Sequence, residues 1–348
     1  MAVSSERTDQ AELAPGGPGD RRYRLVTLIG RIRELSLLAV LAVIVLVVSV
    51  QEPRFATAGN LRQILLSVSI LAIVAVGQTV VVITRNVDLS VGSMVGLTAY
   101  LTADLLARRP GLPLLAVCVL GCLLGAVMGA FNGLLVSVGK VPAIVATLGT
   151  LYMFRGVDFI VAGGKQVNAA DVPRGFLNLA TGSVAGVPNL ILFAAVVALV
   201  GAVALRSTRS GRQLYGIGSN PQAAVLAGIR AGRLVFVAFV VCGLLCGLAG
   251  VLWSARFATV DARAATGLEL LVVAAVVVGG VNIFGGSGTV LGAVLGAILL
   301  GTIENSLTLL RLSQFWLQAI DGAAILAAVT ADSLITRRVQ RILLRRRP

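Results

Sequence analysis

Ionisable residues inside the long apolar stretches of this 348-residue chain are the first candidates for chemistry. A charge at membrane depth is costly and usually serves a function. These residues are Asp88, Asp104, Arg155, Asp158, Glu304, Asp321 and Asp332. Arg155 and Asp158 are three positions apart and can pair on one helix, while Asp104 and Asp332 lie near expected helix ends. Asp88 and Glu304 therefore remain as candidate intramembrane acids.

The segment around Asp88 is a polar interruption between two apolar helices, with almost no room for an ordinary loop. Its candidate residues are Asn86, Asp88, Ser90, Gly92 and Ser93. Backbone that is not helical is tolerated at membrane depth only when it is buried in protein or lines a watery cavity. Two interpretations stay open. The segment is either a structured element beside a solute pathway or a tight turn at the inner surface, with Asp88 or Ser90 capping the next helix.

A second interruption is rich in glycine and contains Gly279, Gly280, Asn282, Gly285 and Gly286. Repeated glycines permit positive φ angles and close approach of two backbones. We therefore expect a structured turn here as well.

The chain lacks the sequence elements of nucleotide-dependent and metal-dependent chemistry. A Walker A loop needs Gly-x-x-x-x-Gly-Lys-[Ser/Thr], but Lys140 is followed by Val141 and Lys165 by Gln166. Histidine, the commonest general base and metal ligand, does not occur. The four cysteines form two apolar i, i+4 pairs, a pattern that favours packing. We expect no catalytic residue, metal or cofactor in this chain, so any ATP and Mg²⁺ must be used by another polypeptide.

The polar stretch 206–233 contains a short helix with clear boundaries. Asn220 is suited to its N-cap, Pro221 to its first position and Gly228 to its end. A helix this short cannot fold alone. It needs a groove, which a partner subunit or the membrane surface could supply.

The composition requires a membrane around these elements. The chain is 57% hydrophobic and 13% charged, with a mean hydropathy of +0.96, so it is much more apolar than a soluble domain. Apolar runs predict an all-α polytopic protein with about ten transmembrane helices. The expected helices are 35–51, 64–84, 91–107, 112–138, 141–163, 189–205, 234–257, 269–283, 287–310 and 317–335.

The remaining segments and the charges complete this organisation. Residues 1–34 are expected to be a disordered cytoplasmic tail, 35–335 the membrane domain with an external loop at 164–188, and 336–348 a basic cytoplasmic tail. Most of the 29 Lys and Arg residues fall on one side if both termini are cytoplasmic. The net charge of +14 therefore reflects topology rather than nucleic-acid binding. Gly121, Gly125 and Gly129, like Gly292 and Gly296, are spaced for close helix packing.

Several separate motifs resemble permeases of the ribose-type ABC sugar importers. In the first half these are residues 86–93, Asn132-Gly133, the run Lys140–Thr150 and Phe154-Arg155-Gly156. In the second half they are Gly211-Arg212, the run from Tyr215 to Ala224, Gly228-Ile229 and residues 274–288. The similarity covers about residues 60–335 in order, and the segments 84–90 and 147–152 are most similar to the rhamnose and autoinducer-2 branches.

The resemblance implies the fold of the larger, type II-like ABC importer permeases in a bacterial inner membrane. It implies a second permease subunit, identical or homologous, two cytoplasmic ATPases and an external sugar-binding protein. Residues 206–233 would dock the ATPase through a coupling helix, with the residues Gly211, Arg212, Tyr215, Gly218, Asn220, Pro221, Ala223, Ala224, Gly228 and Ile229. Asn132, Thr147, Gly149 and Thr150 join the pathway or structural-turn candidates.

The expected function is import of a monosaccharide by alternating access, with specificity mainly in the binding protein. The alternative is an ion- or proton-coupled secondary transporter that uses Asp88 and Glu304 as coupling carboxylates. A membrane-embedded enzyme is the third class, but it would need a catalytic cluster that the sequence does not show.

Overall fold

The computed structural model describes residues 18–257 and 259–311, together with 313, 315, 316, 319, 320, 322, 323, 326 and 330. Residues 1–17 of the expected N-terminal tail lie outside this part of the chain. So do the basic tail 336–348 and most of the expected helix 317–335, with Asp321 and Asp332.

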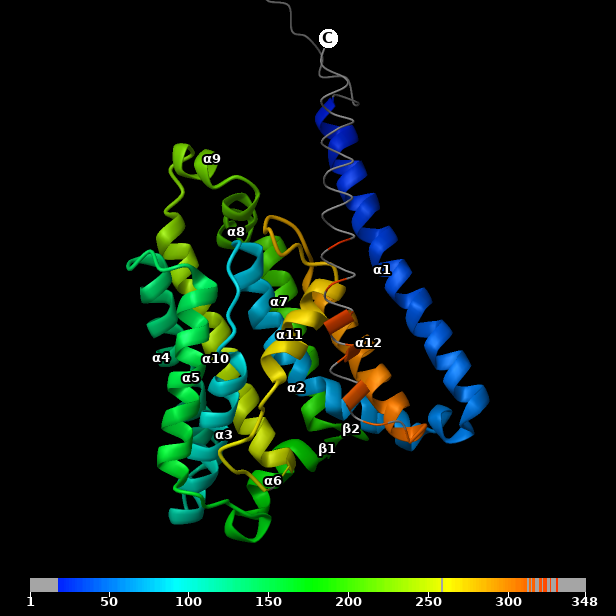
Figure 1. Cartoon of the computed structure of the whole chain (residues 1–348), viewed down its shortest axis with the longest axis vertical. Coiled ribbons are helices and arrows are strands. Elements are labelled where there is room, and N and C mark those ends of the chain that lie inside the picture. The colour runs from blue at the N-terminus through cyan, green and yellow to red at the C-terminus, as the bar shows by residue number, and fades with distance from the viewer. Residues whose placement is uncertain are drawn as a thin grey trace, which may run out of the picture.

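Seven helices of the described chain are long and apolar enough to cross a membrane, and they run roughly along the long axis of the molecule (Figure 1). They are α1 (Pro18–Gln51), α2 (Ala58–Ile83), α4 (Leu114–Ser137), α5 (Ala143–Ala162), α7 (Asn189–Ser207), α10 (Ala231–Phe257) and α12 (Val290–Leu309). The chain is thus a polytopic helical membrane protein, as its composition predicts. α1 begins well before the expected residue 35, because Pro18 suits a first helical position and no further proline interrupts the helix before Pro53.

Two shorter helices are each preceded by irregular chain (Figure 1), which is mostly buried before α3 and alternates between buried and exposed residues before α11. α3 (Val91–Arg108) follows the segment 84–90, and α11 (Leu268–Val278) follows 259–267. At 1.5 Å per residue α11 is about 16 Å long, roughly half of a bilayer core. The expected extension of this helix to residue 283 is wrong, because the chain turns at Gly279 and Gly280 adopts a φ of 98°.

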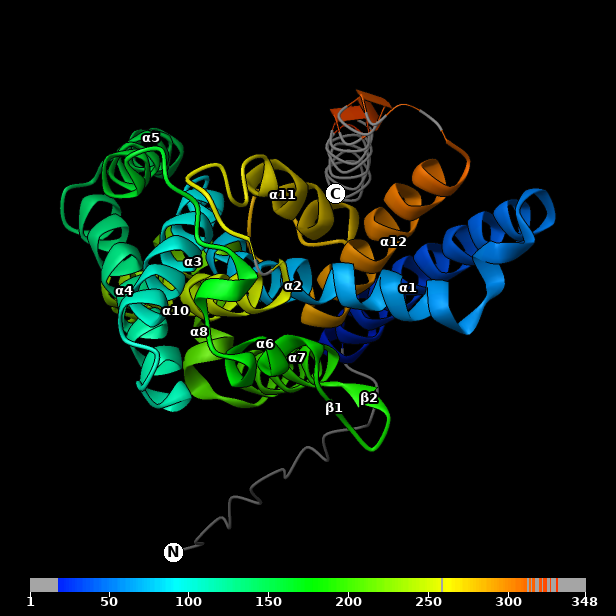
Figure 2. The same cartoon turned by 90° about the horizontal axis from the view of Figure 1, so that it is seen from below.

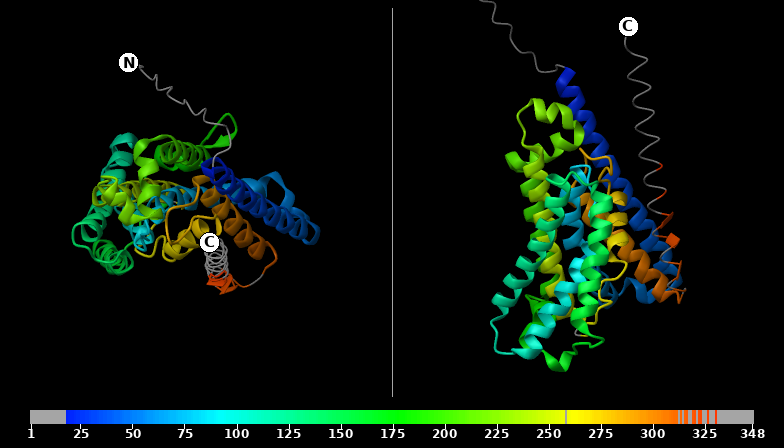
Figure 3. Two further views of the ribbon diagram at one scale, coloured as in Figure 1. Left: turned by 90° about the horizontal axis from the view of Figure 1, so that it is seen from above. Right: turned by 60° about the vertical axis from the view of Figure 1, so that its left-hand side comes forward.

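The two ends of the bundle carry different connections (Figures 1 and 3). We call one the α9 end; it carries α8 (Arg209–Ser219) and α9 (Pro221–Leu226), and α1 begins towards it. The opposite, α6 end carries η1 (Pro53–Ala56), η2 (Ala169–Asp171) and α6 (Arg174–Thr181), followed by a short hairpin. In this hairpin β1 (Ser183–Val184) pairs antiparallel with β2 (Val187–Pro188), a small exception to the all-α prediction.

α2 is the central helix of the bundle. In its most apolar window 89% of the residues are buried, compared with 11% in both α1 and α7. α10, α11, α12 and α7 pack around α2, and α10 also packs on α3 and α4 (Figure 2). The apolar outer faces of α1 and α7 therefore suit contact with lipid or another membrane subunit.

Glycines bring α4 and α10 into backbone contact. A Cβ atom at Gly125 would collide with the carbonyl oxygen of Gly243 and lie 2.6 Å from the amide nitrogen of Gly247. Gly121 and Gly129 meet the same helix. Gly292 and Gly296 likewise contact the backbone of Gly279 and Ala275. The prediction of close packing from the glycine spacing is confirmed.

Gly125→Ala should destabilise the fold by about 1–3 kcal/mol, because the new methyl group has no room between two backbones. Gly156→Ala in α5 is the matched control, since nothing lies within 4 Å of the Cβ it would add. Thermal unfolding in detergent measures the difference. Equal midpoints for the two variants would contradict the packing described.

Candidate functional site

The short helix α9 has the boundaries that the sequence predicts. The Asn220 side chain accepts a hydrogen bond from the Ala223 amide at 3.0 Å, Pro221 is the first helical residue, and Gly228 ends the turn with a φ of 74°. The Ala224 carbonyl accepts from the Ile229 amide at 3.0 Å. These contacts fix both ends of the short helix at the α9 end.

The side chains of α9 divide into a buried and an exposed set. Ala224 is buried, whereas Ala223 is exposed. Leu226 is 90% exposed and Val225 is 63% exposed. Two large apolar side chains are thus exposed on a helix that lies outside the spanning segments (Figure 1).

α8 is an addition that the sequence does not predict, and it joins α9 to the core. Thr208 caps it by accepting from the Gly211 amide at 3.0 Å, and Arg212 donates to the Ser207 carbonyl at 3.0 Å. At its other end, Gly218 touches the carbonyl of Ile83 so closely that no Cβ would fit. The last turn of α8 is therefore pressed against the end of α2.

Arg85 fastens this contact. Its Nε donates to the Gly218 carbonyl at 2.5 Å and its Nη2 to the Ser219 carbonyl at 3.0 Å. Arg85 itself has a φ of 68°, which a non-glycine residue adopts only at some cost. Arg85, the second residue of the 84–90 segment, thus binds the last two residues of α8. Sequence reasoning did not single out Arg85; an arginine beside the polar segment was the available signal.

The glycine-rich segment 279–288 lies against the same joint. The Gly286 amide donates to the Ile83 carbonyl at 2.9 Å, and Gly285 and Gly286 both have a φ of 80°. The Asn282 side chain accepts from the Phe284 amide at 2.7 Å. Tyr215 of α8 donates from its hydroxyl to the Gly288 carbonyl at 2.8 Å, and burial raises the pKa of this phenol, so it remains a donor at neutral pH.

The polar residues after Arg85 form a fully buried cluster. Asp88 Oδ1 accepts from the Ser90 amide at 2.9 Å and from the Ser90 hydroxyl at 2.7 Å. Asn132 of α4 donates to the Ser90 hydroxyl at 2.8 Å and lies 3.3 Å from Asp88 Oδ2. Asp88, Ser90 and Asn132 are all buried without residual exposure. The structure thus brings these three sequence-predicted residues together.

The backbone of this segment is satisfied by side chains from neighbouring helices. With its amide oriented to suit its partners, Gln78 donates to the Asp88 carbonyl (3.3 Å) and accepts from the Asp88 amide (3.2 Å). The Thr147 hydroxyl accepts from the Leu89 amide at 3.1 Å and lies 3.2 Å from the Val87 carbonyl. Of the two interpretations of the segment, the structure supports a structured buried element.

The capping role suggested for Asp88 or Ser90 is wrong. Ser90 occupies the N-cap position of α3, but its side chain makes no capping bond, because it is engaged by Asp88 and Asn132. Ser93 donates back to the Ser90 carbonyl at 2.8 Å. Asn86 donates to the Thr84 carbonyl at 3.1 Å, outside the cluster.

The other candidates are scattered. Thr150 donates to the Thr147 carbonyl at 3.2 Å, whereas Gly149 is exposed on α5 and has open space where a Cβ would stand. Gly92 lies against Glu269 of α11. Glu304 lies towards the α6 end of α12, where it lines a cavity. Asp88 and Glu304 therefore belong to different parts of the molecule.

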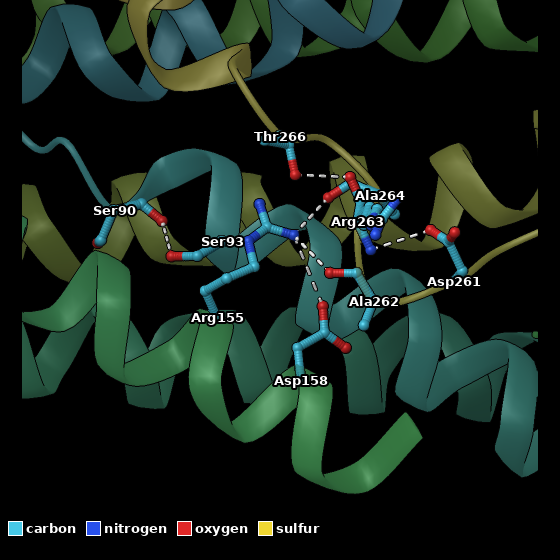
Figure 4. Close-up of polar contacts among 9 residues, drawn as sticks. All are labelled: Ser90, Ser93, Arg155, Asp158, Asp261, Ala262, Arg263, Ala264 and Thr266. Atoms are coloured by element: carbon cyan, nitrogen blue, oxygen red, sulfur yellow. Dashed lines mark hydrogen bonds and ion pairs between the residues drawn. The ribbon is translucent and has the colours of Figure 1, made fainter. Parts of the chain in front are cut away.

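A second polar site, which the sequence predicts only in part, holds the segment before α11 (Figure 4). Arg155 Nη1 donates to the carbonyls of Ala262 (3.0 Å) and Ala264 (2.7 Å). The expected pairing with Asp158 is present at 3.8 Å. Arg155 thus connects α5 to irregular backbone far away in the sequence, a contact that spacing alone could not indicate.

Comparison with known proteins places these features in context. Residues 60–329 match the family described as branched-chain amino acid transport system / permease component. The autoinducer 2 import system permease protein LsrC of Salmonella typhimurium is 36% identical over 298 residues, which are 85% of this chain and 84% of that protein.

Two further relatives are described as ribose import permease proteins. RbsC of Escherichia coli is 36% identical over 288 residues (82% of this chain, 89% of that protein). RbsC of Haemophilus influenzae is 34% identical over 290 residues (83% and 89%). No solved structure matches this chain.

Asp88→Ala should destabilise the protein by about 1–3 kcal/mol, because it leaves the Ser90 amide without an acceptor inside the bundle. Ser93→Ala is the control, since Ser93 bonds only within its own turn among the contacts described. Thermal unfolding in detergent compares them. A midpoint for Asp88→Ala equal to that of Ser93→Ala would contradict the structural role of the cluster.

Proposed function

Because this chain belongs to the branched-chain amino acid transport system / permease component family, we propose that it is the membrane-spanning permease of an ATP-binding-cassette importer. The observation that carries the proposal is the exposed apolar pair Val225 and Leu226 on α9, attached to the core through Arg85. Exposure of such apolar side chains to water is unfavourable, and a groove on a partner subunit would bury them.

The proposed partners follow from this arrangement. Two cytoplasmic ATPases bind ATP and Mg²⁺ and receive α9, with the coupling loop 206–233 as their docking element. A second permease subunit, identical or homologous, completes the pathway through the membrane. An extracytoplasmic sugar-binding protein docks at the α6 end, on 164–188. The α9 end is then cytoplasmic, with both termini, and the protein lies in a bacterial inner membrane.

The proposed cargo is a neutral monosaccharide or a solute of similar chemistry. Two relatives are named for ribose and another for autoinducer 2. A neutral polyol needs only transient polar contacts, which suits a bundle with few buried charges. Many ribose and xylose permeases resemble this chain but carry a Gly-Gly-Ile-Asp-type segment where it has Arg85-Asn86-Val87-Asp88. This departure does not name one sugar.

The contacts at the α9 end suggest how movement of the ATPases is transmitted to the membrane helices. Movement of α9 pulls on Ser219 and Gly218, which Arg85 binds directly. Arg85 belongs to the segment that leads into the Asp88 cluster and α3. Tyr215 transmits the same movement to Gly288, ahead of α12. ATP-driven closure of the ATPases would thus move α8 and the two irregular segments together, and open the pathway inward.

The buried cluster weakens the alternative of a proton-coupled carrier. Asp88 accepts bonds from Ser90 and Asn132, which explains it as part of the fold. Glu304 lines a cavity nearer the α6 end to which Asp88 does not contribute, so the two acids do not share one site.

Leu226→Asp should abolish co-purification of the ATPase subunit, because it places a charge in an apolar docking groove. Ala223→Asp should weaken it less, since Ala223 is exposed beside the apolar pair. Ala224 is a poor test position, because it is buried and its replacement would disturb the packing of α9 itself.

The control is Gln222→Asp, another exposed position at the start of α9. Undiminished ATPase binding by Leu226→Asp would refute the docking role. Uptake driven by an imposed ion gradient without any ATPase would refute the importer as a whole.

Arg85→Met should uncouple the importer: the ATPase still binds, but transport falls by at least about tenfold because α9 loses its charged attachment to the core. Arg209→Met, on the exposed side of α8, is the control. ATP-dependent uptake and ATP hydrolysis are measured in the same proteoliposomes. Normal uptake per ATP in Arg85→Met would exclude this route of coupling.

A further inference from the structure

A cavity of about 580 Å³ opens between α2, α10, α11 and α12 in the half of the bundle nearer the α6 end. Its size is within the range of about 300–1,000 Å³ that is typical of small-molecule sites. Apolar residues of α2 and α12 and the N-terminal part of α11 line it. Neither the Asp88 cluster nor the coupling loop contributes to it.

The lining combines aromatic faces with hydroxyl and carboxylate groups. Trp253 and Phe257 of α10 have ring centroids 4.6 Å apart, with 44° between the ring planes. Ser67, Thr266 and Glu304 supply the polar groups. An aromatic face with hydrogen-bonding groups beside it suits a solute ring that has an apolar face and a polar edge. A lipid chain would leave the polar groups without use.

The charges beside the cavity balance each other. Arg256 donates from Nη2 to the Ser67 hydroxyl at 3.2 Å and lies 5.3 Å from the Phe257 ring centroid. Glu304 supplies the opposite charge on α12. Glu304 lines the cavity and Arg256 lies beside it, bonded to the lining residue Ser67, so the carboxylate faces a nearby positive charge and the site suits a neutral solute.

One wall of the cavity, the segment before α11, is held in place by Arg155. Residues 265–268 line it, and the preceding carbonyls of Ala262 and Ala264 are bound by Arg155. Figure 4 shows this clamp, with Thr266 donating to the Arg263 carbonyl at 2.7 Å on the same segment. On α3, a Cβ at Gly96 would lie 2.5 Å from the Ala264 carbonyl. The wall is therefore preorganised rather than free to collapse.

From these observations we infer that the cavity is a subsite for a neutral, monosaccharide-sized polyol, in which Trp253 stacks on the apolar face of the solute ring and Glu304, Thr266 and Ser67 contact its hydroxyls. The inference rests on the proposed import function and adds the residues that meet the solute inside the membrane. The Arg155 clamp positions the wall and does not itself touch the solute.

The chain offers a direct optical test, because it contains only 2 tryptophans and Trp316→Phe leaves Trp253 alone. In lipid nanodiscs, D-ribose and L-rhamnose should change Trp253 fluorescence and reduce its quenching by iodide about twofold, since bound solutes shield the ring they cover. L-Leucine at the same concentration should do neither. Absence of a response to both sugars, or an equal response to leucine, would overturn the inference.

Variants of the lining residues distinguish the contribution of ring stacking from that of the Glu304 charge. Trp253→Ala should raise the KM for sugar uptake about fivefold to tenfold, and Trp253→Phe should recover most of this loss. Glu304→Gln should change it by no more than about twofold, since an amide also bonds hydroxyls. Phe193→Ala, in an apolar groove on α7, is the control.

The outcome remains distinguishable from that of the importer proposal. If ATP-dependent uptake persists but Trp253 fluorescence does not respond to sugars, only the subsite is rejected. The same holds if iodide cannot reach Trp253 in the complete complex. Loss of ATP dependence with wild-type chain rejects the importer. A large KM increase in Glu304→Gln would also reject the subsite as described, because a charged solute would then be bound.

Discussion

The structure depends on one constraint: backbone polar groups inside a bilayer must find partners within the protein. Long helices meet it by themselves. The two irregular segments before α3 and α11 cannot, and each is served by side chains from other helices. Gln78 and Thr147 bind backbone groups of the first, and Arg155 binds carbonyls of the second. The polar residues of this apolar chain are thus concentrated where regular structure is interrupted.

These segments also lie where a conformational change would be transmitted through the bundle. The first contains Arg85, which binds the end of α8, and the second forms a wall of the cavity. A regular helix moves as a rod, whereas a helix joined to an irregular segment can tilt about the joint. In the proposed importer, the interruption before α3 would provide a hinge for alternating access, while Arg155 holds the interruption before α11 in place. Glycine contacts between α4 and α10 keep the surrounding bundle rigid.

Much of the fold was predictable because a bilayer imposes simple rules on sequence. The apolar runs predicted every spanning helix in the described chain, and Asn220, Pro221 and Gly228 correctly bounded α9. Hydropathy did not predict all of the helix ends. The end of α11 at Gly279 and the early start of α1 depend on local geometry that hydropathy does not record. α8 was missed because its apolar residues are few and its sequence contains three glycines.

The sequence by itself determined that this protein lies in a membrane, lacks a Walker A loop and carries a short capped helix that cannot fold alone. Composition, periodicity and capping are local properties, so they can be read along the chain. Only the tertiary structure decided that Asp88 belongs to a buried cluster, that Arg85 holds α8, and that Arg155 supports the wall of a cavity lined by Trp253. Those contacts join residues that are far apart in sequence, and their geometry exists only once the helices have packed.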